Sequence, residues 1–170
     1  MEIRTIRPDE WPALREIRLR ALRDSPDAFG ATYDDEAASP DEAWQHRADR
    51  PDGTLIVAVD DAGRFVGMGS GGPAPDHREF AAIYGMWVEP AARGQGIGEG
   101  IIRAIAEWAG TAGYDDIGLG VTIGNVPAIR LYERLGFRDT GLRYPLRDDT
   151  DLTIQVMATS LDELDAYFDA

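Results

Sequence analysis

The residues with the plainest chemical implication are the glycines of one short segment. Gly94, Gly96 and Gly98 alternate along it, after an apolar run at residues 83–88 and before a helical pattern that begins near Ile97. Glycine lets the backbone come close to a ligand, and the free N–H groups of a first helical turn attract an anion. A strand, a glycine-rich turn and a helix in this order predict a phosphate-binding turn.

Two common phosphate-binding patterns do not fit this turn. A P-loop requires a lysine directly after its last glycine, and no lysine follows these glycines. The dinucleotide pattern Gly-x-Gly-x-x-Gly also fails, because the place of its third glycine holds Glu99 in one register and Ile101 in the next. What remains is the pattern Arg-x-x-Gly-x-Gly at residues 93–98, or a glycine-rich connection that binds nothing.

A second group of polar side chains lies in the segment 125–137. Asn125, Ala128 and Tyr132 share one face of the helix expected there, because they are three and four residues apart. An amide and a phenol would then flank a small residue that lets another group pack closely. The alternative is a buried tyrosine that serves only packing.

Composition narrows the classes of function. The chain has 17 basic and 31 acidic residues, and its formal net charge of −14 argues against nucleic-acid binding and against anionic membrane surfaces. An acidic protein suits an amine substrate, although acidity also confers solubility. The chain has no cysteine, and its two histidines lack metal-binding spacing, so we expect no disulfide, no thiolate nucleophile and no metal site.

Targeting and membrane signals are not evident in the sequence. The first residues do not resemble a signal peptide, and no apolar run reaches the length of about 18 residues typical of a membrane span. We therefore expect a cytoplasmic protein.

Periodicity and turn signals predict one domain over residues 1–170, of mixed α/β (α+β) class, with a mostly antiparallel sheet flanked by helices. Strands are expected at residues 2–7, 54–59, 64–70, 80–88, 117–121, 137–146 (interrupted at 139–141) and 152–157. Helices are expected at residues 8–23, 39–48 (with Ser39 as N-cap), 97 to about 110, 125–135 and 161–168 (with Ser160 as N-cap), and a partial helix at 27–33. The first helix carries arginines that indicate a solvated or ion-paired face: Arg15, Arg18, Arg20 and Arg23.

The two motifs together resemble those of the GNAT superfamily, the acetyl-CoA-dependent N-acetyltransferases. The pattern at residues 93–98 resembles the coenzyme-A motif of this superfamily. The pattern Asn-x-x-Ala-x-x-Leu-Tyr-x-x-Leu-Gly-Phe at residues 125–137 resembles its second motif, and it follows about 30 residues later, as it does in the superfamily. The expected element order, β-α-α-β-β-β-α-β-α-β-β, is also that of the GNAT fold. The resemblance is weakest over residues 26–51.

The resemblance implies a role for each matching residue. The pyrophosphate of coenzyme A would lie on backbone N–H groups of the first motif, which consists of Arg93, Gly94, Gln95, Gly96, Ile97 and Gly98. Met86 and Val88 match positions whose backbone binds the pantetheine arm, where one N–H also polarises the thioester carbonyl. Asn125 matches a further cofactor contact. Tyr132 matches the general acid that protonates the departing thiolate.

The general base is the point at which this chain departs from the superfamily. Many relatives carry a glutamate in the strand before the glycines, but residues 81–88 contain no carboxylate. Glu79, just ahead of this strand, is our candidate base, with a water chain as the alternative. Tyr84 and Glu36 are further candidates, and an amine with a lowered pKa would need no dedicated base.

The expected function is transfer of an acetyl group from acetyl-CoA to a primary amine by direct attack, without metal or covalent enzyme intermediate. The acceptor would be a small molecule or a peptide, bound by residues 29–36 and 142–147. Two alternatives are an acyltransferase for a longer acyl-CoA and a non-catalytic coenzyme-A-binding module. Both a monomer and a homodimer are compatible with the apolar terminal segment.

Overall fold

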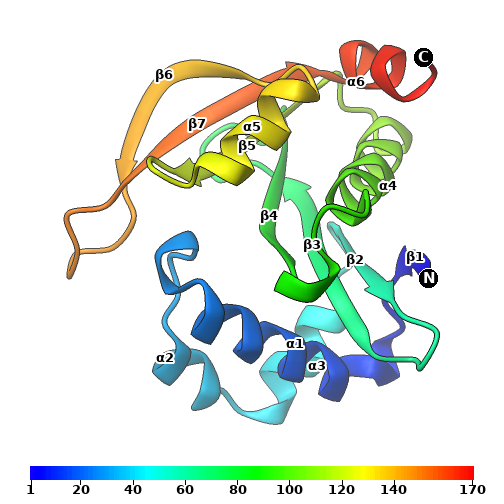
Figure 1. Ribbon diagram of the computed structural model, residues 1–170, viewed down its shortest axis with the longest axis vertical. Helices are drawn as coiled ribbons and strands as arrows, with labels where there is room; N and C mark the ends of the chain where they lie inside the picture. The colour runs from blue at the N-terminus through cyan, green and yellow to red at the C-terminus, as the bar shows by residue number, and fades with distance from the viewer.

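The computed structural model describes residues 1–170 as a seven-stranded sheet with helices on both faces (Figure 1). The strands are β1 (Glu2–Thr5), β2 (Thr54–Val59), β3 (Phe65–Pro73), β4 (Ala81–Val88), β5 (Asp116–Thr122), β6 (Arg138–Pro145) and β7 (Thr153–Ser160). Their order is β1-β2-β3-β4-β5-β7-β6. Only β4 and β5 pair in parallel, so the sheet is mixed and mostly antiparallel, as predicted.

The helices lie in two groups. The α-helices are α1 (Trp11–Asp24), α2 (Tyr33–Ala37), α3 (Asp41–Ala48), α4 (Ile97–Thr111), α5 (Val126–Arg134) and α6 (Leu161–Phe168). Three single turns of 3-10 helix are η1 (Pro8–Glu10), η2 (Pro26–Ala28) and η3 (Pro90–Ala92). None of the helices combines the length and the apolar character that a membrane crossing requires.

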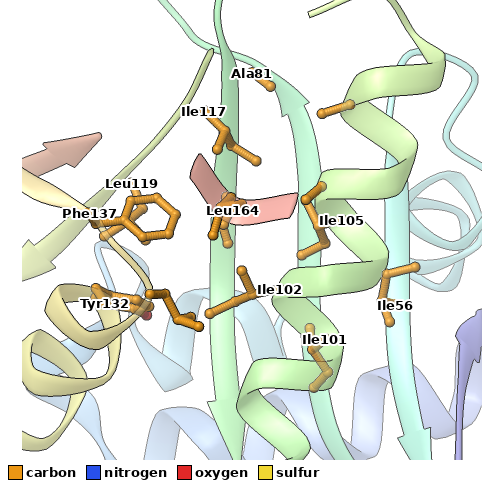
Figure 2. Close-up of a cluster of buried hydrophobic side chains, with 14 of the residues drawn as sticks. Ile56, Ala81, Ile101, Ile102, Ile105, Ile117, Leu119, Tyr132, Phe137 and Leu164 are labelled. Atoms are coloured by element: carbon orange, nitrogen blue, oxygen red, sulfur yellow. The ribbon is translucent and has the colours of Figure 1, made fainter. Parts of the chain in front are cut away.

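Each face of the sheet has its own hydrophobic core. One core joins β2–β5 to α4, α5 and α6, and Figure 2 shows Ile101, Ile102 and Ile105 along the face of α4 that packs on the sheet. The other core joins β2 and β3 to α1 and α3, with Trp44 fully buried in it. Since both faces of β2 are covered, its six residues are all buried rather than alternating.

Close packing of α4 on the sheet depends on glycines of β3. Gly69 and Gly71 face α4, where a β-carbon on Gly69 would lie 2.7 Å from Cγ2 of Ile101, and one on Gly71 would lie 2.7 Å from Cγ2 of Ile105. Such distances are far inside van der Waals contact, so the absence of side chains brings the helix and the sheet together.

The parallel pair β4–β5 is joined at one end only. Its ladder connects residues 81–83 to residues 117–119 and goes no further, although both strands continue. On its other side, β4 bulges at Gly85, whose φ is +60°, opposite the register shift between Met68 and Ser70. The chain thereby leaves the β5-facing edge of β4 unpaired from residue 84 to residue 88.

The helices with clear periodicity agree with prediction. Helix α4 begins at Ile97, and α5 begins one residue later than expected. Helix α6 follows Ser160, whose hydroxyl oxygen accepts a hydrogen bond from the backbone N–H of Glu163 at 3.2 Å. The expected N-cap is therefore present.

Two predictions in the least regular segment are wrong. The partial helix expected at residues 27–33 is instead η2 followed by α2, which begins at Tyr33 because the hydroxyl oxygen of Thr32 accepts from the N–H of Asp35. Ser39 does not cap α3. Its hydroxyl donates backwards to the carbonyl of Asp35, and Pro40 occupies the cap position without a side-chain bond.

Candidate active site

The glycine turn presents the N-terminus of α4 without a side-chain cap. Gly96 is its N-cap with a φ of +77°, and Gly94 has a φ of +75°, so both adopt a left-handed backbone that favours glycine. A β-carbon at either position would meet no protein atom within 4 Å. The space over the turn is therefore open to a ligand, and the N–H groups of the first helical turn face it unsatisfied by any side chain.

Arg93 anchors this turn to the rest of the fold. Its Nε donates to the backbone carbonyl of Val88 at 2.8 Å, and its Nη2 donates to Asp24 at the end of α1 at 2.9 Å. The hydroxyl of Ser25 and the indole N–H of Trp87 donate to the same carboxylate, and these two hydrogen bonds, with the one from Arg93, lower the pKa of Asp24. In the structure the side chain of Arg93 thus holds β4, the turn and α1 together.

The unpaired edge of β4 opens into a small cavity that we call the strand cleft. It has a volume of about 70 Å³. Its lining includes Phe29, Gly85, Met86, Asn125, Ala128 and Tyr132. The structure therefore brings together three predicted site residues from β4 and α5, namely Met86, Asn125 and Tyr132. Val88 lies on the same strand, two residues nearer the glycine turn.

Tyr132 is the buried phenol of the strand cleft. It is 7% exposed, and burial raises its pKa to about 12 with no hydrogen bond to offset the shift. Its ring lies edge-on to Phe137, with 5.9 Å between the ring centres, and Figure 2 shows the two side chains together at the border of the core. At neutral pH this phenol keeps its proton and can donate it into the cleft.

A second and larger cavity, which we call the arginine cavity, lies between β3, β4 and the first three helices. It has a volume of about 290 Å³. The polar and aromatic part of its lining consists of Arg18, Glu36, Trp44, Arg47, Arg50 and Tyr84, with Ser70 at the wall of β3. Gly85, the bulged residue, lines this cavity as well as the strand cleft, so the two cavities meet at the bulge.

Glu36 is held by two arginines inside the arginine cavity. Its Oε2 accepts from Nε of Arg18 at 2.9 Å and from Nη1 of Arg47 at 3.1 Å, while its Oε1 accepts from Nη2 of Arg18 at 3.0 Å. Burial raises the pKa of Glu36, but the two guanidinium groups outweigh it and hold the pKa below its ordinary value. The carboxylate stays charged and paired, which makes it a weak proton acceptor.

The other candidate bases do not approach the reacting region as free bases. Glu79 lies in the loop ahead of β4, 65% exposed, where its carboxylate meets the ring of His77 at 3.2 Å, and it lines neither cavity. Tyr84 lines the arginine cavity, but its hydroxyl donates to the carbonyl of Pro73 at 2.8 Å, and burial raises its pKa. The predicted role of Glu79 thus has no geometric support.

The sequence interpretation missed most of the arginine cavity. It treated the arginines of α1 as a solvated or ion-paired face, and Arg18 is indeed paired with Glu36. It assigned nothing to Trp44, Arg47 or Arg50, which come from α3 and the turn after it. Glu36 and Tyr84 are the exceptions, because the sequence names both as candidate bases and places Glu36 in the segment expected to bind the acceptor.

Comparison with known proteins identifies acetyltransferases as relatives of this chain. Residues 11–137 match the model of the acetyltransferase (GNAT) family. Mycothiol acetyltransferase of Acidothermus cellulolyticus is 30% identical over 158 residues, which are 83% of this chain and 46% of that protein. Streptothricin acetyltransferase of Streptomyces lavendulae is 37% identical over 101 residues, covering 53% of this chain and 52% of that protein. The chain spans about half the length of these curated relatives.

Solved structures agree on the fold. A GNAT-family acetyltransferase from Streptococcus pneumoniae superposes with a TM-score of 0.79 at 17% identity, over 94% of this chain and 98% of that one. A putative acetyltransferase from Salmonella typhimurium, solved with acetyl-CoA, gives a TM-score of 0.76 at 22% identity, over 95% of this chain and 94% of that one. The family match, the sheet that opens between β4 and β5, and the glycine turn at α4 agree: the chain belongs to the acetyltransferase (GNAT) family.

Proposed function

We propose that this protein transfers an acetyl group from acetyl-CoA to a primary amine by direct attack. The observation that carries the proposal is the strand cleft, where the buried, protonated Tyr132 faces the unpaired edge of β4. A phenol that keeps its proton at neutral pH, beside free backbone groups, suits a reaction in which a thiolate leaves and a carbonyl oxygen gains charge.

The residues present fit coenzyme A. The open, uncapped N-terminus of α4 suits a pyrophosphate, because fixed N–H dipoles bind an anion even in an acidic protein. The free edge of β4 at Met86 and Val88 suits an extended arm with amide groups. The carbonyl of Val88 already accepts from Arg93, so we assign the ligand contact at that residue to its N–H.

Bound acetyl-CoA supplies a thioester, whose carbonyl carbon is the electrophile. The chain's task is to orient this carbon against an amine, exclude water and manage two proton transfers. As the C–N bond forms and the C–S bond breaks, Tyr132 gives its proton to the sulfur. The amine nitrogen releases one proton in exchange, and water in the arginine cavity passes it on to solvent or back to Tyr132.

The acceptor enters, in this proposal, from the arginine cavity. That cavity meets the strand cleft at Gly85, and it is the larger of the two spaces. The curated relatives are named for different compounds, mycothiol and streptothricin, so the family by itself does not assign the acceptor.

The test is release of free coenzyme A from acetyl-CoA in the presence of a panel of primary amines. The chain suits a thiol-detecting assay because it contains no cysteine, and it contains no lysine whose acetylation would add background. We expect amine-dependent thiol release together with an acetylated product seen by mass spectrometry. Binding of acetyl-CoA without thiol release from any amine would instead identify a non-catalytic coenzyme-A-binding protein.

A further inference from the structure

The arginine cavity carries a charge opposite to that of the whole protein. The chain has a formal net charge of −14, yet the charged groups that line this cavity are three arginines and one glutamate. Arg18 and Arg47 share the single carboxylate of Glu36. The cavity therefore keeps excess positive charge, which is unusual in a chain with almost twice as many acids as bases.

Arg50 is the cation without a partner. The carboxylate of the cavity pairs with Arg18 and Arg47 alone, and Arg50 takes part in no salt bridge or hydrogen bond of the protein. Its guanidinium lies against two glycines: a β-carbon on Gly72 would be 3.1 Å from Nη2, and one on Gly53 would be 3.3 Å from Nε. The side chain is thus confined at the cavity wall and half-buried without a counter-charge, so it is free to pair with an acidic group of a ligand.

The other free nitrogen groups of the cavity are donors too, whereas the free hydroxyl of Ser70 can donate or accept. Trp44 is fully buried, and its indole Nε1 has no hydrogen-bond acceptor. Nη1 of Arg18 makes no hydrogen bond and lies at the bulge, 3.2 Å from where a β-carbon of Gly85 would be. The hydroxyl of Tyr84 already donates to Pro73. Donors in excess, with the one carboxylate already used, call for a ligand that brings oxygen acceptors and negative charge.

From this arrangement we propose that the acceptor is a small amine that also carries a carboxylate, bound by Arg50 while its amino group reaches Gly85. A guanidinium binds a carboxylate through two parallel hydrogen bonds, so it fixes orientation as well as charge. The cavity of about 290 Å³ is at the lower end of ligand pockets, which favours an acceptor of amino-acid size. This inference rests on the proposed acetyl transfer.

The same charge distribution explains how the reaction proceeds without a free base near the cleft. An ammonium group placed at Gly85 would lie beside the guanidinium of Arg18, which itself stacks on Phe29 with 4.7 Å between the Cζ atom and the ring centre. A neighbouring positive charge disfavours the protonated amine. Because Arg18 shares the carboxylate of Glu36 with Arg47, the charge beside Gly85 stays positive on balance and favours binding of the neutral, nucleophilic amine.

The test compares matched acceptors in the thiol-release assay. Each L-amino acid is paired with the amine that remains after loss of its carboxylate, and with its carboxamide. We expect kcat/KM at least 10-fold higher for the carboxylate member of the preferred pair. Arg50→Gln should reduce kcat/KM for the carboxylate-bearing acceptor about 10-fold or more, chiefly by raising KM. It should leave kcat/KM for the carboxylate-free amine unchanged. Arg50→Lys should restore part of the preference.

A control variant and a second test variant separate this effect from a general loss of function. Arg103→Gln removes a half-exposed arginine on α4 that pairs with Glu107, and it should change kcat/KM for neither of the matched acceptors. Gly72→Ala displaces the Arg50 guanidinium without removing it, so it should also weaken the carboxylate preference. Equal rates for matched acceptors, or equal losses for both in Arg50→Gln, would overturn the carboxylate proposal alone. Acetyl-CoA binding without transfer to any amine would overturn the proposed acetyl transfer itself, and with it the carboxylate proposal.

Discussion

At the scale of single residues, two polar groups of the candidate site have no hydrogen-bond partner within the chain. They are the hydroxyl of Tyr132, a residue that is 7% exposed, and the guanidinium of the half-buried Arg50. In the proposed reaction the ligands supply these partners, so both side chains are preorganised for binding.

Replacing Tyr132 by Phe tests the acid directly. We expect kcat to fall about 100-fold, because proton donation to the leaving thiolate is lost, and the dissociation constant of acetyl-CoA to change less than about 2-fold. The folded state should be as stable as the wild type or more so, since the removed hydroxyl has no hydrogen bond. Steady-state kinetics and a binding titration measure both quantities.

The matched control is Tyr114→Phe. Tyr114 packs on Trp108, with 5.8 Å between ring centres, and lines neither cavity. The substitution Tyr114→Phe should leave kcat unchanged. An unchanged kcat in Tyr132→Phe would remove this phenol from the mechanism.

Which site residues are predictable from sequence depends on where their partners lie in the chain. Asn125 and Tyr132 are within one helix, so their spacing along the chain already places them on one face. Arg50 is not predictable in this way, because its environment is created by β3 and β4 folding against α3. Glu79 illustrates the converse: it precedes β4 at the end where β4 and β5 are paired, whereas the strand cleft opens beyond the other end of that ladder.

At the scale of elements, the proposed cofactor binding depends on the N-terminus of α4. Its cap needs a left-handed residue, and Gly96 supplies it with a φ of +77°. Alanine at this position should destabilise the fold by about 1–2 kcal/mol through backbone strain and should raise KM for acetyl-CoA as the turn deforms. Thermal unfolding and kinetics at varied acetyl-CoA check the two effects.

Gly63→Ala provides the matched control for this strain. Gly63 lies in the turn between β2 and β3 with a φ of +80°, and a β-carbon there would also meet no protein atom within 4 Å. A similar loss of stability is expected, with no change in KM. If both variants raise KM equally, the effect comes from strain alone and not from the turn at α4.

The junction of β1 and η1 has a pH-dependent clamp. Glu10 accepts from Nη1 and Nη2 of Arg4 at 2.8 and 2.7 Å and from the N–H of Arg7 at 2.8 Å, which lowers its pKa to about 2. Because the folded-state pKa lies below the unfolded value near 4.5, this stabilisation is present above pH 4.5 and disappears as the pH falls towards 2.

Glu10→Gln should therefore destabilise the protein by about 1–2 kcal/mol at pH 7, with the difference from the wild type vanishing at low pH. Urea unfolding at pH 7 and pH 3 measures this. Glu2→Gln is the control, since Glu2 is 67% exposed and meets Arg4 only at 3.5 Å. A difference at pH 3 as large as that at pH 7 would exclude the clamp.

Elements with a strong local signal agree with prediction, and those without it do not. Helix α4 has an apolar face and α6 a serine cap, so both could be located from the sequence. The segment between α1 and α3 has no long apolar stripe, and its short helix α2 is positioned by the single cap at Thr32 and by packing of Tyr33 under Arg23. Tertiary contacts decide such segments.

At the scale of the whole molecule, one sheet joins the two hydrophobic cores. Neighbouring residues of β2 contribute to opposite faces, as Ile56 and Val57 do, so neither core can be lost without exposing the other side of the same strand. We therefore propose that residues 1–170 act as one cooperative unit, and we expect a single thermal transition. Two separated transitions in calorimetry would contradict this.

A ligand that binds across this unit should stabilise all of it. Acetyl-CoA at about 100 times its dissociation constant should stabilise the folded state by about 2.7 kcal/mol, which for a chain of this size raises the melting temperature by about 5–10 °C. NAD and ATP at the same concentration should give a much smaller shift, because the glycine turn lacks the dinucleotide and P-loop patterns. Equal shifts with all three would indicate a general anion site at the N-terminus of α4. No shift with acetyl-CoA, in folded protein free of bound coenzyme, would overturn the cofactor assignment and with it the proposed reaction.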